Sequence, residues 1–121
     1  MAAFDELSGI APLRIWDGVA ARAVEGERVT LAVVELDASS VIPEHAHENE
    51  QVGLMLAGSM AFRISGETRE VLAGSTWSIP PNVPHEVSVG PEGAVVVEAF
   101  VPARADWGGL EQEKPRAPRW P

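Results

Sequence analysis

The chain has 121 residues, of which 45% are hydrophobic, and both values are typical of one globular domain with its own core. It contains no cysteine, which excludes disulfides, thiolate zinc sites, iron–sulfur clusters and a cysteine nucleophile. Its net charge of −9 repels phosphate backbones, and no apolar run is long enough to span a bilayer, so we expect neither nucleic acid nor membrane as a partner.

The first two candidate strands lie near residues 13–18 and 20–27. Further along, hydrophobic residues recur with a period of two, which predicts strands rather than helices. These runs are rich in Val, Ile, Leu and Phe, and they cover residues 28–37, 51–58, 59–66, 68–74, 75–80, 85–90 and 93–102. A tight hairpin is expected at ISGETREV, with Gly66 and Glu67 at its turn. The pattern predicts an all-β sandwich or barrel.

Residues 103–121 end the chain with several prolines and no hydrophobic period. We expect this segment to be an arm that lies on the surface or is partly disordered. No repeat or linker divides the chain, so residues 1–121 are predicted to form one domain with its core over about residues 13–102. The start of the chain lacks the basic and apolar stretches of a secretory signal, which makes the cytoplasm the expected location.

Three histidines, His45, His47 and His85, carry the strongest functional signal. His45 and His47 are two residues apart, so on an extended strand both rings point to the same face and can reach one metal ion. Gln51 shares their parity, and His85 follows the proline-rich residues 79–84. Imidazole nitrogens and an amide oxygen together suit zinc, iron, nickel, copper or manganese. The pair His45 and His47 is by itself also compatible with a surface position unrelated to His85.

The spacing of these residues resembles the two motifs of the cupin superfamily. The first motif, G-x5-H-x-H-x3/4-E-x6-G, is matched by His45, His47, Gln51 in the Glu position and Gly58. The second, G-x5-P-x-G-x2-H-x3-N, is matched by Gly74, Pro80, Asn82 in the Gly position and His85. The remaining departures are Ser39 for the first Gly and Val89 for the final Asn. The resemblance implies a single-domain cupin, which is an all-β jelly-roll barrel or double-stranded β-helix.

Residues 45–87 and 96–107 more closely resemble the small single-domain cupins of the pectin-degradation type. Those proteins are taken to convert 4,5-unsaturated uronate monosaccharides into their linear keto form, and their fourth metal ligand is Gln. The resemblance implies a divalent transition metal, such as nickel, zinc, iron or manganese, held by His45, His47, Gln51 and His85. It also implies catalytic roles for Glu98, Phe100 and Arg104, although Glu98 stands where the group usually has Asp. Small cupins commonly pair as homodimers, and we expect the same here.

The chemistry of these side chains agrees with an anionic substrate. Three neutral imidazoles and a neutral amide leave the charge of a metal uncompensated, so the site should attract an anion and stabilise a developing enolate. Glu98 can move a proton if burial raises its pKa, and the planar fork of Arg104 matches a carboxylate. A small anionic substrate is therefore expected.

Each of these side chains has an alternative role. Glu98 can face outward, Phe100 can belong to the core, and Arg104 can pair with the acidic body of the chain. Glu50 is a rival fourth ligand if the loop is shifted by one residue. Trp77 can pack in the core or stack on a sugar.

Three functions remain open at the level of the sequence. The first is a metal-dependent lyase or isomerase that acts on unsaturated or keto sugar acids. The second is a metal-dependent dioxygenase, since the same histidines support both. The third is a non-catalytic cupin that binds a small molecule.

Overall fold

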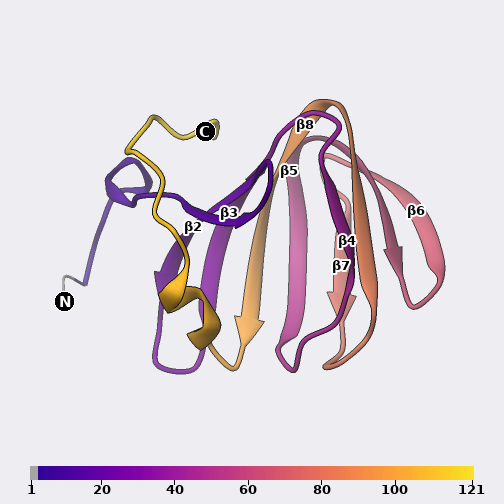
Figure 1. Ribbon diagram of the computed structural model, residues 1–121, viewed down its shortest axis with the longest axis horizontal. Helices are drawn as coiled ribbons and strands as arrows, with labels where there is room; N and C mark the ends of the chain where they lie inside the picture. Colours follow the sequence, from indigo (N-terminus) through magenta and orange to yellow (C-terminus); the bar gives the residue numbers. More distant parts are fainter. Residues whose placement is uncertain (1–2) are drawn as a thin grey trace.

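The computed structural model describes residues 3–121, and the first two residues of the predicted domain lie outside it. Over this range the chain forms eight antiparallel strands and two short 3-10 turns, which confirms the predicted all-β class (Figure 1). The strands are β1 (Leu13–Trp16), β2 (Val19–Glu25), β3 (Thr30–Leu36), β4 (Val41–His45), β5 (Glu50–Ile64), β6 (Glu67–Leu72), β7 (Thr76–Ile79) and β8 (His85–Val101). The described residues contain no helix long and apolar enough to cross a membrane.

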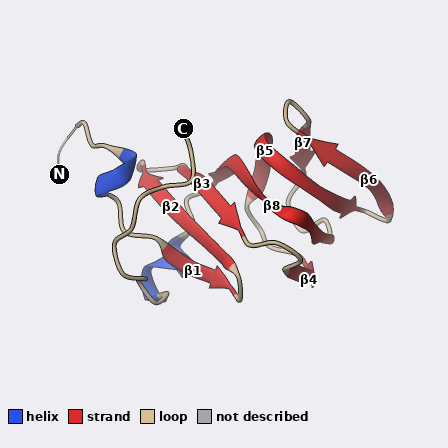
Figure 2. Ribbon diagram, turned by 90° about the horizontal axis from the view of Figure 1, so that it is seen from above, coloured by secondary structure: helices blue, strands red, loops and turns tan. Residues whose placement is uncertain are grey.

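The sheet follows the order β1-β2-β3-β8-β5-β6, while β4 pairs with β8 and β7 pairs with β5. The two turns, η1 (Leu7–Gly9) and η2 (Ala105–Gly109), both lie on the side of β1 and β2 (Figure 2). Inward side chains of β2, β3, β5 and β8 form one apolar cluster that includes Ala21, Val34, Phe62 and Val96. Val34, Phe62 and Val96 also line the cavity described below.

The two longest strands, β5 and β8, were each predicted as two separate runs, and that prediction was wrong. In each strand the first predicted run ends at a glycine. These glycines mark irregularities within a continuous strand pair and not turns. The register shifts on either side of Gly58, which has a φ of 87°. A Cβ on Gly58 would overlap the carbonyl oxygen of Gly93, so glycine is required where the two strands bend together.

The predicted hairpin is present between β5 and β6, but its turn is one residue earlier than expected. Ile64 pairs with Glu67, so Ser65 and Gly66 form the two-residue loop. Their φ values of 50° and 82° are the left-handed pair that a type I′ turn requires. The prediction placed Glu67 in the turn because it did not anticipate Ser65 in a left-handed conformation.

The C-terminal arm is ordered by pairing with β1. Gln112 forms a bridge with Leu13, and the backbone nitrogen of Arg14 donates to the oxygen of Glu111 at 3.0 Å. The nitrogen of Glu113 donates to the oxygen of Pro12 at 2.8 Å. The arm therefore lies on the surface, which was one of the two expectations for this segment. It covers β1, the edge strand of the sheet.

A buried ion cluster ties the end of the arm to the outer face of β2 and β3. Arg22 donates to Glu35 at 2.7 Å, and both side chains are almost fully buried. Glu35 also accepts hydrogen bonds from the side chain of Arg116 and from the backbone nitrogen of Arg119, the latter at 2.7 Å. Burial raises the pKa of Glu35, but these hydrogen bonds outweigh it and hold the pKa below its ordinary value.

Replacing Glu35 should destabilise the fold. We expect Glu35→Gln to lower the free energy of unfolding near pH 7 by about 3 kcal/mol, because it leaves Arg22 buried without a counter-charge. The pKa of Glu35 is lower in the folded chain than its ordinary value of 4.5, so its contribution is complete above that value. The contribution is lost as the pH falls toward the folded pKa. Urea unfolding at a series of pH values measures both effects.

Glu113→Gln is the matched control, because Glu113 pairs with the same Arg116 at 3.3 Å but is more exposed. It should change the stability little, as exposed ion pairs usually do. Equal losses in the two variants, or an unchanged pH dependence in Glu35→Gln, would contradict the role assigned to the buried cluster.

Candidate metal centre and adjoining cavity

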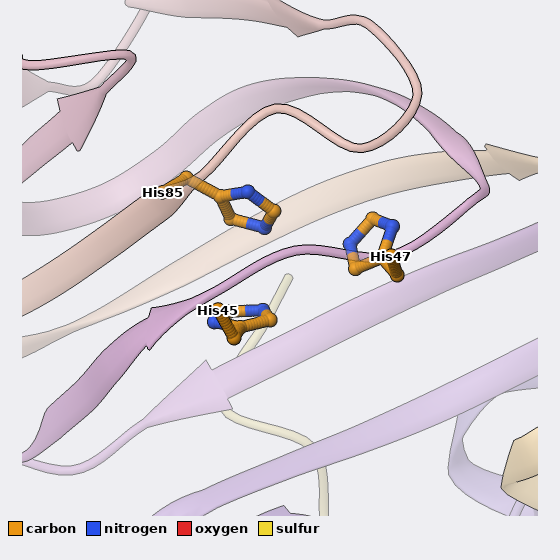
Figure 3. Close-up of side chains that lie close together, drawn as sticks. All are labelled: His45, His47 and His85. Carbon is orange, nitrogen blue, oxygen red and sulfur yellow. The ribbon is translucent and has the colours of Figure 1, made fainter.

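The three histidines come together where β4 ends and β8 begins. His45 is the last residue of β4 and His85 is the first of β8, and the two are paired in register. His47 lies beyond the end of β4, so the expectation of one extended strand through both residues was wrong. The backbone nitrogen of Asn82 donates to the oxygen of His47 at 2.8 Å and holds this segment beside β8. The ring centroids lie 4.3 to 5.7 Å apart (Figure 3).

Two motif positions that lack the usual glycine still adopt the glycine conformation. Ser39 has a φ of 62° and Asn82 has a φ of 65°. Asn is one of the residues that tolerate this left-handed region, as expected for Asn82, and Ser39 takes the same conformation. The backbone path of the motifs is therefore retained despite both departures.

The hydrogen bonds of the imidazole rings define their tautomers. Each ring places Nδ1 at 2.8 to 3.0 Å from a backbone carbonyl oxygen two residues away, in Pro43, Asn49 and Val83 respectively. A carbonyl oxygen only accepts, so each Nδ1 must carry the hydrogen. In the neutral ring this leaves the lone pair on Nε2. This arrangement, with a carbonyl behind each ring, is typical of histidines that bind a metal.

Burial keeps two of these rings neutral. Burial, together with the positive charges of the nearby histidines and Arg104, lowers the pKa of His85 to about 4, although the hydrogen bond to the Val83 carbonyl opposes the shift. It also lowers the pKa of His47, with a smaller contribution from the positive charge of Arg104. Neutral imidazole is the form that binds metals.

Gln51 adds a fourth acceptor to the cluster. It is 5% exposed, and its Oε1 lies 3.0 Å from Nε2 of His47. Its Nε2 donates to Oε2 of Glu98, an oxygen that also accepts from Trp77, so the amide oxygen faces the histidines. Glu50, the rival ligand, is exposed at the start of β5. No hydrogen lies between Oε1 of Gln51 and Nε2 of His47, since both atoms are acceptors.

The acceptors therefore converge without a donor among them. One ligand atom from each histidine lies within 4.8 Å of the others, and Oε1 of Gln51 joins them at His47. Neutral acceptors at such distances repel one another unless a cation lies between them. Three imidazole nitrogens and one amide oxygen fit a divalent transition metal by donor type.

Glu98 faces inward, next to this cluster. It lies on β8 opposite Gly53 of β5, and Gly53 in turn lies opposite Trp77 of β7. The indole Nε1 of Trp77 donates to Oε2 of Glu98 at 2.9 Å, and Gln51 donates to the same oxygen. Burial raises the pKa of Glu98, although both hydrogen bonds oppose the shift. Trp77 is thus a core residue whose polar atom contacts the site.

Phe100 and Arg104 lie on the other side of His47. Phe100 is 3% exposed, and its ring centroid lies 5.9 Å from that of His47. The guanidinium carbon of Arg104 lies 4.9 Å from the centroid of Phe100 and 4.8 Å from that of Trp107. Its fork donates to both oxygens of Asp106 at 3.0 and 2.9 Å. Arg104 therefore reaches the site, but a neighbouring carboxylate engages its fork.

The three histidines and the groups around them, with the exception of Trp77, line one cavity of about 190 Å³. The predicted residues in its lining are His45, His47, Gln51, His85, Glu98, Phe100 and Arg104. The opposite walls are apolar and include Leu36, Met60, Phe62 and Val87. The cavity therefore combines a polar end, where charge can be held, with an apolar interior that limits access of water.

Among the cavity residues that the sequence did not single out are Trp16, Asp106 and Trp107. Trp16 lies in a candidate strand and contacts His45, with 5.2 Å between ring centroids. Asp106 and Trp107 lie in η2, within the segment that resembles the pectin-degradation cupins. They lie in a stretch without a hydrophobic period, so the sequence gave no indication that they reach the cavity. Their contact with Arg104 depends on the turn of η2.

Comparisons with known proteins agree with this geometry. Residues 32–100 match the family described as Cupin domain. A stretch of 64 residues is 34% identical to the pectin degradation protein KdgF of Dickeya dadantii (strain 3937). This alignment covers 52% of the present chain and 58% of that protein, which is less than two thirds of its length.

Two solved structures share the fold over most of their length. The RmlC-like cupin from Shewanella frigidimarina NCIMB 400 has a TM-score of 0.81 and 22% identity, covering 88% of this chain and 96% of that one. KdgF from Halomonas sp. has a TM-score of 0.79 and 21% identity, covering 88% and 98%. Since the family match spans more than half of the chain and contains all three histidines, the chain belongs to the cupin family.

Proposed function

We propose that this cupin is a cytoplasmic, metal-dependent lyase or isomerase that converts unsaturated or keto uronates to their linear keto form. One observation carries the proposal: neutral metal-binding acceptors, a buried carboxylate and an arginine fork line the same cavity. The similarity to a pectin degradation protein supports a sugar acid as the substrate class.

The donor set would hold a divalent transition metal through His45, His47, Gln51 and His85. All four ligands are neutral, so the metal keeps its charge. When bound, such a metal supplies Lewis-acid stabilisation for negative charge on a substrate oxygen. Each imidazole is kept in the ligand tautomer by its backbone carbonyl, so no rearrangement is needed on binding.

Glu98 would move the proton. Ring opening of an unsaturated uronate is an isomerisation: the anomeric hydroxyl loses a proton, the bond between C1 and the ring oxygen breaks, and C4 gains a proton. A single carboxylate can accept the first proton and return one to carbon, without any co-reactant. Oε2 of Glu98 already accepts from Trp77 and Gln51, so Oε1 is the atom that would carry the proton.

Arg104 would bind the substrate carboxylate. Its guanidinium lies over the rings of Phe100 and Trp107, and these cation–π contacts keep the fork at the cavity. The dioxygenase alternative draws on the same histidines, but it makes no use of the arginine fork. We therefore favour the isomerase.

The first test is metal content together with activity. Purified protein should contain about one transition metal ion per chain, and His85→Ala should lose it, since a metal ligand is removed. With unsaturated galacturonate, the ultraviolet absorbance of the C=C bond should fall faster than in buffer. Glu98→Ala should lower kcat by at least about 100-fold, the usual contribution of a general acid–base. A metal-loaded chain with no acceleration over buffer would contradict the proposed reaction.

The second test concerns the pair formed by Arg104 and Asp106. Asp106 engages the fork that the substrate needs, so Asp106→Asn should lower KM for a uronate by about two- to fivefold, the range expected for an exposed ion pair. Steady-state kinetics with the charged uronate and with its methyl ester measure the effect, which should be confined to the charged form. Glu67→Gln, which breaks a comparable pair with Arg69 away from the cavity, is the control. A KM that does not fall would argue against Arg104 as the carboxylate site.

We also infer that the chain forms a homodimer through the outer face of β3, β8 and β5. Leu31, Ala99 and Val52 form one row across these strands, and Val33, Val97 and Leu54 form the next. Leu31, Val52 and Leu54 are more than a third exposed. An uncharged apolar patch on an acidic chain is complementary to the identical patch of a second copy.

A charge within this patch should separate the dimer. Light scattering should give the mass of two chains for the unaltered protein and of one chain for Leu31→Arg, because the arginine would be buried unpaired at the interface. Leu72→Arg lies on β6, outside the patch, and should leave the mass unchanged. A monomeric mass for the unaltered chain would contradict the inference.

A further inference from the structure

Trp77 reaches Glu98 across an intervening strand. β5 lies between β7 and β8, and Gly53 of β5 is the residue that separates Trp77 from Glu98 in the register. A Cβ at Gly53 would overlap the indole nitrogen and two further ring atoms of Trp77. Gly53 thus leaves room for the indole over the backbone of β5, where its N–H reaches the carboxylate.

The amide of Gln51 can face the histidines with its oxygen or with its nitrogen, and a neighbouring group must select one orientation. The two ends of an amide are similar in size, but only the oxygen binds a cation, while the nitrogen carries two hydrogens. The carboxylate of Glu98 accepts from the nitrogen and so turns the oxygen toward His47. A side chain that could donate at this position would allow the opposite orientation.

We propose that Glu98 and Trp77 are positioning residues that hold the Gln51 amide with its oxygen toward the three histidines, and that Gly53 makes their contact possible. The inference rests on the proposed metal site but not on the proposed reaction. Trp77 fixes Oε2 of Glu98, Oε2 fixes the nitrogen of Gln51, and the amide oxygen is thereby presented as a ligand.

This arrangement separates two roles of Glu98. Positioning uses Oε2, whereas a proton would be carried on Oε1, which has no hydrogen-bond partner within residues 3–121. Positioning therefore requires an acceptor at Oε2 but not a negative charge. Partners of this kind behind a metal ligand typically change metal affinity by about 10- to 100-fold.

The experiment measures binding of Co²⁺ to the full chain, by titration and by the visible absorption spectrum, which reports the ligand set. Glu98→Met fills the same space without an acceptor and should weaken Co²⁺ binding about 10- to 100-fold with a changed spectrum. Glu98→Gln should stay within about threefold of the unaltered chain, because the Trp77 N–H keeps the new amide oxygen facing Gln51. Glu98→Gln should nevertheless be inactive, since an amide does not accept and release a proton near neutral pH.

Trp77→Phe and Gly53→Ala test the rest of the arrangement. Both should weaken Co²⁺ binding by about tenfold, the first by removing the N–H and the second by displacing the ring. Trp107→Phe is the matched control, because its indole nitrogen is also buried in the cavity lining but has no hydrogen-bond partner in the described part of the chain. It should bind Co²⁺ like the unaltered chain. Circular dichroism identifies any variant that fails to fold, and Glu98→Gln against Glu98→Met then decides the question.

The outcomes are distinct. Equal losses in Glu98→Gln and Glu98→Met would show that charge rather than orientation matters, and would overturn the inference. Unchanged Co²⁺ binding in Glu98→Met would do the same. Absence of Co²⁺ binding by the unaltered chain would overturn this inference and the proposed metal site together. Tight binding with the expected order of variants, but without uronate turnover, would leave the inference standing and overturn only the proposed reaction.

Discussion

The antiparallel pairing of β5 with β8 is the constraint on which the site depends. It runs from Glu50 paired with Val101 to Ile64 paired with His85. At one end it places Gln51 beside Phe100, and two residues further it places Gly53 beside Glu98. Side chains opposite each other in a sheet share a face, so the register alone directs these groups into the same cavity. A slip of β5 by one residue would turn Gln51 outward, away from Phe100 and Glu98.

At the polar end of the cavity, the histidine nitrogens and the Gln51 oxygen are hydrogen-bond acceptors with no donor among them. Backbone carbonyls fix the hydrogens of the three imidazoles on the outer nitrogens, and Glu98 fixes the hydrogens of the Gln51 amide on its far side. What remains at the centre is a set of converging lone pairs, the donor arrangement that a transition-metal cation prefers. The same logic explains why Gln rather than Glu at position 51 matters for the proposed function, in which a neutral ligand would leave the metal's charge available for an anionic substrate.

Aromatic side chains surround this polar end and control its geometry. Phe100 touches His47 and Trp107, and both aromatic rings hold the guanidinium of Arg104. On the other side Trp77 packs against Phe62 and reaches the carboxylate of Glu98. In the proposed reaction, groups supported in this way would lose little freedom when a substrate binds, which favours catalysis.

The sequence by itself determined the fold class and the metal-binding candidates, because both depend on local spacing. Period-two hydrophobicity specifies strands, and the distances from His45 to Gln51 and from Gly74 to His85 are set along the chain. Only the tertiary structure decided that Glu98 faces inward, that Trp77 contacts it across Gly53, and that Asp106 engages Arg104. It also decided that Glu35 orders the C-terminal arm. These contacts join residues from different strands or depend on a turn. The local pattern of residues predicts neither the register between strands nor the conformation of that turn.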